Sequence, residues 1–268
     1  MTLFTVQQGA ASLAGEQAGQ GVAVVFLHAG VADRRMWRRQ LGAFAATHQV
    51  VAYDRRGFGE TQAAPEPHSP AEDLLAVLDS LNIGRAVLVG CSQGGKVALD
   101  FVLAHPERAL ALVLVAPAVS GAPAPDELPA PVEALLEALE EAEASGDLER
   151  LNALEARIWL DGVLGSDGRV QGEARDLFLA MNSVALSAGP VGEERPAGPA
   201  WPRLGEVCRP TLVLYGDLDF PHVQERCEAL AREIPGAGRT VLSGTAHLPN
   251  LESPEAFDAA LAAFLGGL

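Results

Sequence analysis

The chain alternates between short, continuous apolar runs and longer stretches in which apolar residues recur at helical spacing. Continuous runs rich in β-branched residues predict strands that are buried on both faces of a sheet. The clearest of these runs are 21–27, 49–53, 85–89, 110–115 and 211–215. Because helix-like stretches separate them, the pattern predicts an α/β fold with a mostly parallel, doubly wound sheet and right-handed crossovers.

The predicted helices have recognisable start and stop signals. Ser69 precedes a stretch that ends near Leu81, where Asn82 and Gly84 supply a stop. Before the first buried run, residues 2–18 contain two mixed segments that predict an antiparallel hairpin. The other predicted elements are helices at 35–46, 96–105, 223–234 and 254–265 and a strand near 239–242.

The alternation of strand and helix stops at Pro117. After a proline-rich stretch, the Glu-, Ala- and Leu-rich segment 132–160 breaks at Gly146-Asp147 and predicts two helices, and 173–187 predicts another. Between about 118 and 205 we find no strand-like run. We therefore expect a helical cap (lid) at 118–205, inserted into an α/β core that consists of 1–117 and 206–268.

Gly90-Cys91-Ser92-Gln93-Gly94-Gly95 joins a predicted strand to a predicted helix. A serine on a sharp strand-to-helix turn between glycines is typical of a nucleophile elbow. Gly90 and Gly94 would leave room where strand and helix close on each other, and the helix N-terminus favours the negative charge of acyl transfer. Cys91 is expected to pack under the turn as a small apolar residue. An ordinary glycine-rich turn has the same pattern, so the choice between such a turn and a nucleophile elbow depends on the other motifs of the chain.

Two more polar residues follow predicted strands, Asp219 after 211–215 and His247 after 239–242. The carboxyl ends of parallel strands lie on one edge of a sheet, so these side chains are expected to converge with Ser92 there. An imidazole can take the proton of a serine hydroxyl, and a carboxylate can orient that imidazole. The order Ser92, Asp219, His247 therefore predicts nucleophilic catalysis.

Composition and charge narrow the classes of partner. The 268 residues include 35 acidic and 19 basic side chains, a formal charge of −16, which disfavours nucleic acid and anionic membranes. The first residues do not resemble a secretory signal, and the apolar runs are too short to span a bilayer, so we expect a cytoplasmic protein. Three widely spaced cysteines fit a reducing compartment. We find no metal-ligand spacing and expect no cofactor.

Jointly, these motifs resemble the α/β-hydrolase superfamily, in its cap-bearing subgroup of esterases, lactonases and cofactor-free haloperoxidase-like proteins. The resemblance extends over nearly the whole chain outside the cap. The chain has His28-Ala29 where the family usually has His-Gly. The matching motifs are 26–30, 54–59, 90–95, 214–219 and 246–254.

The resemblance implies a serine hydrolase that cleaves a small carboxylic ester or lactone through an acyl-enzyme, with Ser92 as nucleophile and His247 as base. The family's acid lies three residues past the glycine that ends its strand, which favours Asp219 over Asp217. The implied oxyanion hole is formed by the backbone N–H groups of Gly30 and Gln93. Because the elbow holds a serine, the carboxylate-nucleophile chemistry of dehalogenases and epoxide hydrolases is not expected.

Some alternatives stay open from the sequence. The same triad serves carbon–carbon bond hydrolysis and acyl transfer, and a non-catalytic small-molecule binding protein could use the same fold. His28 is expected to hydrogen-bond neighbouring loops. Arg55 and Arg56 are expected to brace the oxyanion loop rather than to meet an acidic substrate. The sequence assigns no oligomeric state. Candidates for lining the substrate pocket, or for ordinary helix packing, are Trp159, Phe178, Met181 and Trp201.

Overall fold

The buried apolar runs form one mostly parallel sheet. A computed structural model describes residues 1–125, 127–195 and 197–268. Its nine-stranded sheet has the order β1-β2-β4-β3-β6-β7-β8-β9, and β5 pairs with β2. The strands are β1 (Thr2–Gln8), β2 (Ala11–Ala18), β3 (Ala23–Leu27), β4 (Gln49–Tyr53), β5 (Gln62–Ala63), β6 (Ala86–Cys91), β7 (Ala109–Val115), β8 (Thr211–Gly216) and β9 (Gly238–Leu242).

Strand pairing confirms the predicted architecture. From β4 through β9 along the sheet all neighbours are parallel, whereas β2 pairs antiparallel with both β1 and β4. Leu27 is paired with Gly90, and Cys91 with Val115. The loops that follow β3, β6 and β7 therefore leave the sheet at the same edge, as expected of parallel strands.

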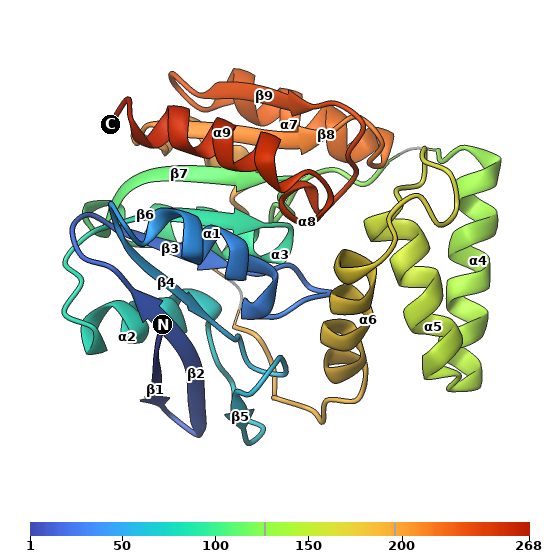
Figure 1. Cartoon of the computed structure of the whole chain (residues 1–268), viewed down its shortest axis with the longest axis horizontal. Helices are drawn as coiled ribbons and strands as arrows, with labels where there is room; N and C mark the ends of the chain where they lie inside the picture. The colour runs from blue at the N-terminus through green and yellow to red at the C-terminus, as the bar shows by residue number, and fades with distance from the viewer. Residues whose placement is uncertain (126, 196) are drawn as a thin grey trace.

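Helices cover both faces of this sheet (Figure 1). Side chains of α2, α3 and α7 pack on one face and those of η1, α1 and α9 on the other. The bounds of the core helices are η1 (Arg34–Trp37), α1 (Arg38–Phe44), α2 (Pro70–Ser80), α3 (Gln93–Ala104), η2 (Pro106–Arg108), α7 (Pro221–Glu233), α8 (Pro249–Glu252) and α9 (Pro254–Leu265).

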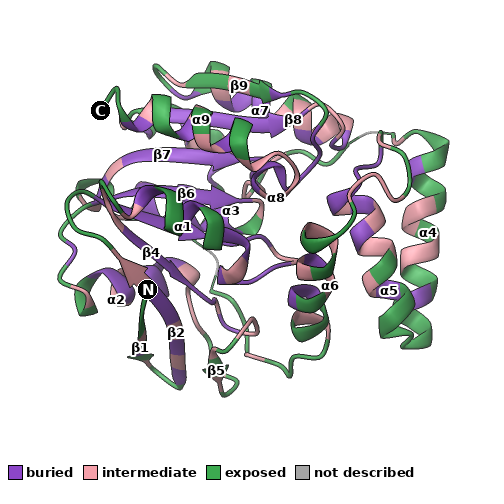
Figure 2. Ribbon diagram, in the orientation of Figure 1, coloured by how far each residue is buried: buried purple, intermediate pink, exposed green. Residues whose placement is uncertain are grey.

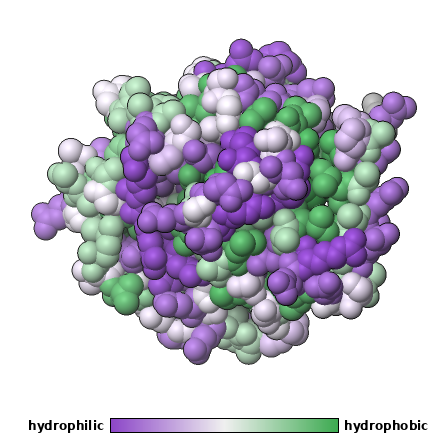
Figure 3. Space-filling model, turned by 45° about the vertical axis from the view of Figure 1, so that its right-hand side comes forward, coloured by the Kyte–Doolittle hydropathy of each residue, from purple (hydrophilic) through white to green (hydrophobic). Residues whose placement is uncertain are grey.

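Burial follows the alternation of side chains along each strand. In β3, Val24 and Phe26 belong to one apolar cluster, and Val25 and Leu27 to the other. Figure 2 shows the buried residues concentrated along the central strands and the exposed ones on the outer sides of the helices. On the surface drawn in Figure 3, hydrophilic and hydrophobic residues are interspersed. Among the described residues, no helix is long and apolar enough to cross a membrane.

The segment from 118 to 205 is helical where it is regular. Its elements are α4 (Ala130–Ser145), α5 (Leu148–Glu155), the π-helix η3 (Ala156–Leu160), α6 (Glu173–Leu186) and the 3₁₀ helix η4 (Trp201–Glu206). Gly146, in the left-handed conformation, ends α4, and the Asp147 side chain caps α5. Figure 1 shows α4, α5 and α6 grouped together beside the sheet. An isolated β-bridge pairs Glu194 of this segment with His68 of the core.

The structure differs from the predictions in one divided helix and in short elements that were not predicted. The helix expected at 35–46 is divided into η1 and α1, because the Asp33 side chain accepts a hydrogen bond from the Arg35 N–H and starts a tight 3₁₀ turn first. The strand β5 was not predicted, because two residues are too short to produce an apolar pattern. Before α9, the chain also forms the short helix α8.

Candidate active site

Ser92 lies on a strained turn between β6 and α3. Its φ of 52° and ψ of −115° are unusual for a residue with a side chain and store about 1–3 kcal/mol of strain. The backbone there is held by three hydrogen bonds: the Ser92 N–H donates to Val115 O, and its carbonyl accepts from Lys96 and Ala118 at 3.1 and 3.0 Å. These bonds fix the backbone from which the Ser92 side chain projects. Cys91 packs in the core beneath it, as predicted, and burial raises the pKa of its thiol well above the ordinary value.

The glycines beside Ser92 lie where three backbone segments meet. A Cβ on Gly94 would collide with the carbonyl groups of Leu27 and His28, and one on Gly90 with the backbone of Gly94. Because the obstacles are backbone atoms, they cannot rotate away. This confirms the predicted need for small residues at both positions.

We expect Gly94→Ala to lower the free energy of unfolding by roughly 1–3 kcal/mol, the usual range for overpacking. Chemical denaturation of wild type and variant measures the change. Gly42→Ala is the matched control, since Gly42 also lies in a helix but has open space around its Cα. That substitution should be neutral or stabilise by up to about 1 kcal/mol. Equal stability of both variants would contradict the packing at Gly94.

His247 and Asp219 form a buried pair at the ends of neighbouring strands. Nδ1 of His247 lies 2.7 Å from Oδ2 of Asp219. The other carboxylate oxygen accepts a hydrogen bond from the N–H of Phe220 at 2.7 Å. A carboxylate on Nδ1 keeps the proton on that nitrogen and leaves Nε2 free to act as an acceptor. Ser92 and His247 line the same cavity.

Asp217 takes a different part in the same loops. Its two carboxylate oxygens accept hydrogen bonds from the Gly244 N–H and the Ser243 hydroxyl, both at 2.7 Å. Asp217 thus ties the end of β8 to the loop that precedes His247, as a turn residue would. The structure brings Asp219, rather than Asp217, to the imidazole.

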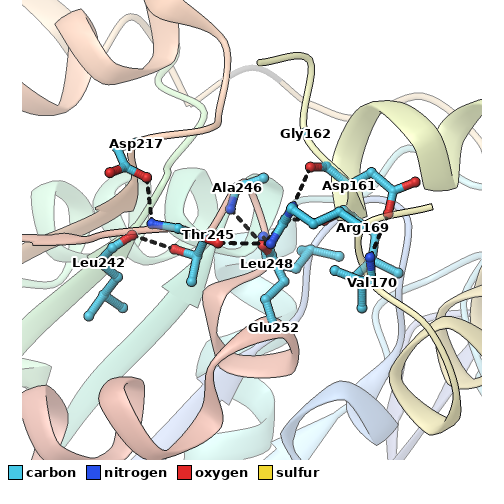
Figure 4. A network of polar contacts seen from close by, with 12 residues as sticks. Asp161, Gly162, Arg169, Val170, Asp217, Leu242, Thr245, Ala246, Leu248 and Glu252 are labelled. Atoms are coloured by element: carbon cyan, nitrogen blue, oxygen red, sulfur yellow. Dashed lines mark hydrogen bonds and ion pairs between the residues drawn. The ribbon is translucent and has the colours of Figure 1, made fainter. Parts of the chain in front are cut away.

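Glu252 on α8 clamps the backbone on both sides of His247. Its oxygens accept hydrogen bonds from the N–H groups of Ala246 at 2.6 Å and Leu248 at 2.8 Å. Arg169, from the 118–205 segment, forms an ion pair with the same carboxylate and also donates to Gly244 O at 2.8 Å (Figure 4). Burial raises the pKa of Glu252, and the hydrogen bonds from Arg169 and the two N–H groups oppose that rise.

Gly30 and Gln93 line the same cavity, and their N–H groups lack partners among the described residues. Gln93 is the first residue of α3, where no earlier helical carbonyl is available, and Gly30 lies in the loop after β3. Within the described parts of the chain, neither N–H makes a hydrogen bond. A Cβ on Gly30 would lie 3.1 Å from Cγ of Gln93, so the two residues are close neighbours. Two free N–H donors beside a serine hydroxyl can stabilise an oxyanion.

His28 and Arg55 brace the loop that contains Gly30, as predicted, whereas Arg56 binds Asp73 and Glu66 instead. Nε2 of His28 accepts a hydrogen bond from the Arg55 N–H at 3.0 Å, and Nδ1 lies 2.7 Å from Ala29 O. The Arg55 guanidinium donates to the carbonyls of His28 and Ala29. Burial lowers the pKa of His28 well below its ordinary value and that of Arg55 to about 10. The neutral imidazole of His28 therefore stabilises the loop through its two ring nitrogens.

Ser92, His247, Gly30 and Gln93 border one cavity of about 290 Å³. Its wall combines loops after β3, β6, β7 and β9 with α7 and the π-helix. Trp159, on that π-helix, packs against His247, with a distance of 4.7 Å between the two ring centroids. The lining residues are Gly30, Val31, Ser92, Gln93, Ala116, Ala118, Glu155, Trp159, His222, Val223, Arg226 and His247.

Of the four aromatic and sulfur side chains considered for the pocket, the structure places Trp159 on the cavity wall. Trp201 lines a neighbouring cavity of about 330 Å³. Phe178 and Met181 are fully buried in the packing of α6 against the core. Their burial follows from helical spacing, which does not distinguish a pocket wall from a packing face.

Three charged or titratable cavity residues were not predicted from the sequence: Glu155, His222 and Arg226. His222 lies in the first turn of α7 and borders both cavities. The sequence does contain a signal for two of these cavity residues, His222 and Arg226, because residues 222, 223 and 226 occupy one helical face directly after Asp219.

Comparison with known proteins gives a consistent set of similarities. A model described as the alpha/beta hydrolase family matches residues 24–260. The 2-hydroxy-6-oxo-6-phenylhexa-2,4-dienoate hydrolase of Burkholderia cepacia is 30% identical over 259 residues, 90% of this chain and 86% of that protein. Est816, described as an N-acyl homoserine lactone degrading enzyme, is 26% identical with a TM-score of 0.75, covering 97% and 99% of the two chains. A thermophilic esterase from Thermogutta terrifontis is 26% identical with a TM-score of 0.73, covering 100% and 99%.

Proposed function

Because the chain belongs to the α/β-hydrolase family and matches hydrolytic enzymes over most of its length, we propose that it is a serine hydrolase of small carboxylic esters or lactones. One observation supports this most strongly. Ser92, the His247 imidazole held by Asp219, and two unpartnered N–H groups border one cavity of about 290 Å³. These are the groups that acyl transfer to serine requires.

The proposed reaction proceeds in two halves. Oγ of Ser92 attacks the carbonyl carbon while Nε2 of His247 takes its proton, and the N–H groups of Gly30 and Gln93 bind the oxyanion. The carbon–oxygen bond to the alcohol then breaks, and the alcohol leaves with the proton from His247. Water, deprotonated by His247, attacks the acyl-enzyme, and Ser92 regains its proton as the acid departs.

We further propose that 118–205 is a cap over a core formed by 1–117 and 206–268. Glu155 and Trp159 of this segment line the cavity together with residues of the core, which supports the division. Arg169 fastens the segment to Glu252 and Gly244 beside His247. Substrate selection would then depend on both parts.

Carbon–carbon bond hydrolysis is the second candidate, supported by the Burkholderia relative. The dienoate in that protein's name contains a ketone and no ester, so its hydrolysis breaks a carbon–carbon bond. A panel of p-nitrophenyl esters, γ-lactones and this dienoate, each assayed for kcat/KM with the same preparation, discriminates between the two. We expect the esters or lactones to be cleaved more efficiently. A tenfold or greater preference for the dienoate would favour the second candidate.

Glu252→Gln tests the support of His247 by α8. The amide keeps the shape of the side chain but places an NH₂ group against one of the two backbone N–H donors and loses the ion pair with Arg169. A shift of the histidine loop by a fraction of an ångström should lower kcat about 10- to 100-fold. Steady-state kinetics with p-nitrophenyl butyrate measure this. Glu255→Gln on the exposed side of α9 is the control and should retain the wild-type kcat; equal kcat in both variants would refute the role of Glu252.

A further inference from the structure

The cavity wall contains one permanently cationic side chain, Arg226. Arg226 lies one helical turn after His222 on α7, and both residues border the Ser92 cavity and the neighbouring cavity that contains Trp201. The two side chains therefore form a common wall between the nucleophile and the outer cavity. This wall has no part in the proposed serine chemistry.

The guanidinium of Arg226 lies close to the elbow and is poorly satisfied. Among the described residues its one hydrogen-bond partner is Pro117 O, which lies 3.5 Å from Nη1, a long distance for such a bond. The next residue, Ala118, donates to the Ser92 carbonyl at 3.0 Å, which places the guanidinium beside the turn that holds the nucleophile. No salt bridge within 1–125, 127–195 and 197–268 includes Arg226. Most of its five N–H donors are therefore available.

His222 adds a second unused polar group. Its Nδ1 is buried and has no hydrogen-bond partner in the described structure. Burial lowers the pKa of His222, and the charge of Arg226 lowers it further, whereas Asp219 and Glu225 oppose the shift. A neutral imidazole has one N–H, so His222 can donate one hydrogen bond next to the guanidinium.

The carboxylates near Arg226 either accept hydrogen bonds from other residues or are exposed to solvent. Asp219 binds His247, and Glu155 accepts a hydrogen bond from Asn182 in the 118–205 segment. Glu225 borders the outer cavity and is exposed. A half-buried guanidinium without a carboxylate partner has lost hydration that no ion pair replaces, and burial lowers the pKa of Arg226 accordingly. A carboxylate ligand would supply the missing partner in the fork geometry that arginine favours.

We propose that the cavity selects substrates that contain a carboxylate, which Arg226 binds with help from His222. This inference rests on the proposed ester or lactone hydrolysis at Ser92 and specifies its substrate class. The preferred substrate is an ester or lactone with a free carboxylate on the acyl or the alcohol side, and the neutral analogue is cleaved less efficiently.

Matched ester pairs test this preference on both sides of the scissile bond. The acyl-side pair is the mono-p-nitrophenyl ester of adipic acid and p-nitrophenyl hexanoate. The alcohol-side pair is 3-acetoxybenzoate and phenyl acetate. We expect wild type to favour the anionic member of at least one pair in kcat/KM. In Arg226→Gln, the anionic-to-neutral ratio for that pair should fall about 10- to 100-fold, as expected for a hydrogen bond to a charged group.

Arg232→Gln is the matched control, because Arg232 lies on the same helix but is exposed and paired with Glu233. It should keep the wild-type ratio. Arg226→Lys retains the charge without the fork, so its ratio should lie between those of wild type and Arg226→Gln. A wild-type preference for the neutral ester in both pairs, or equal ratios in wild type and Arg226→Gln, would overturn the proposal.

The same assays distinguish a failure of the proposed serine hydrolysis from a failure of the carboxylate preference. If wild type cleaves none of the four esters, or if cleavage survives in Ser92→Ala, the proposed serine hydrolysis is wrong. If the neutral esters are cleaved through Ser92 while the ratios stay equal, only the carboxylate preference is wrong.

Discussion

Ser92→Ala is expected to lower kcat/KM for p-nitrophenyl butyrate by at least about 10⁴-fold, because the variant lacks the hydroxyl that forms the acyl-enzyme. The hydroxyl makes no hydrogen bond within the described structure, so its removal should leave Tm nearly unchanged. Steady-state kinetics and thermal denaturation on the same preparation measure both quantities. Activity within tenfold of wild type would exclude Ser92 as the nucleophile.

Ser92→Gly sharpens this test by separating strain from chemistry. At a φ of 52°, glycine avoids most of the steric cost that serine or alanine pays. The variant should therefore be as inactive as Ser92→Ala yet more stable to unfolding by about 1 kcal/mol. A stability below that of Ser92→Ala would contradict the strained conformation of the elbow.

Asp219→Asn should lower kcat by about 10³- to 10⁴-fold. The amide can donate to Nδ1 of His247 and so favours the tautomer with the proton on Nε2, which cannot accept the proton of Ser92. It also removes the charge that stabilises the imidazolium. Rates of p-nitrophenyl butyrate hydrolysis across Asp219→Asn and wild type measure this loss.

Asp217→Asn is the control for that substitution, two residues away and of the same chemistry. Asp217 accepts hydrogen bonds from Gly244 and Ser243 and does not contact the imidazole. Its replacement should lower kcat by less than about tenfold, through the loop alone. Equal losses in the two variants would mean that the loop, and not the charge beside His247, determines the rate.

The sequence was sufficient for the parts of the fold that depend on local pattern. The runs that became β3, β4, β6, β7 and β8 are apolar enough to predict buried strands, and parallel pairing follows from the helices between them. Ser92 and Asp219 could be proposed as site residues because each follows such a strand, and His247 because it follows the strand β9 at the edge of the sheet. Their convergence is then a consequence of topology rather than of any local feature.

The cavity wall could not be predicted in the same way, because it depends on how the 118–205 segment packs. Trp159 reaches His247 from a π-helix, a local change of helical pitch that no periodicity indicates. Phe178 and Met181 have the same apolar character as Trp159 but face the core. Arg226 looks like any surface arginine of an amphipathic helix until the two cavities beside it are known.

The most direct test of the central claim is the site at which a fluorophosphonate probe reacts. Such probes phosphonylate an activated serine hydroxyl, and peptide mass spectrometry locates the adduct. The account predicts one adduct per chain, on Ser92 in the turn 90–95, and none in Ser92→Ala. An adduct on another residue, or undiminished labelling of Ser92→Ala, would contradict it.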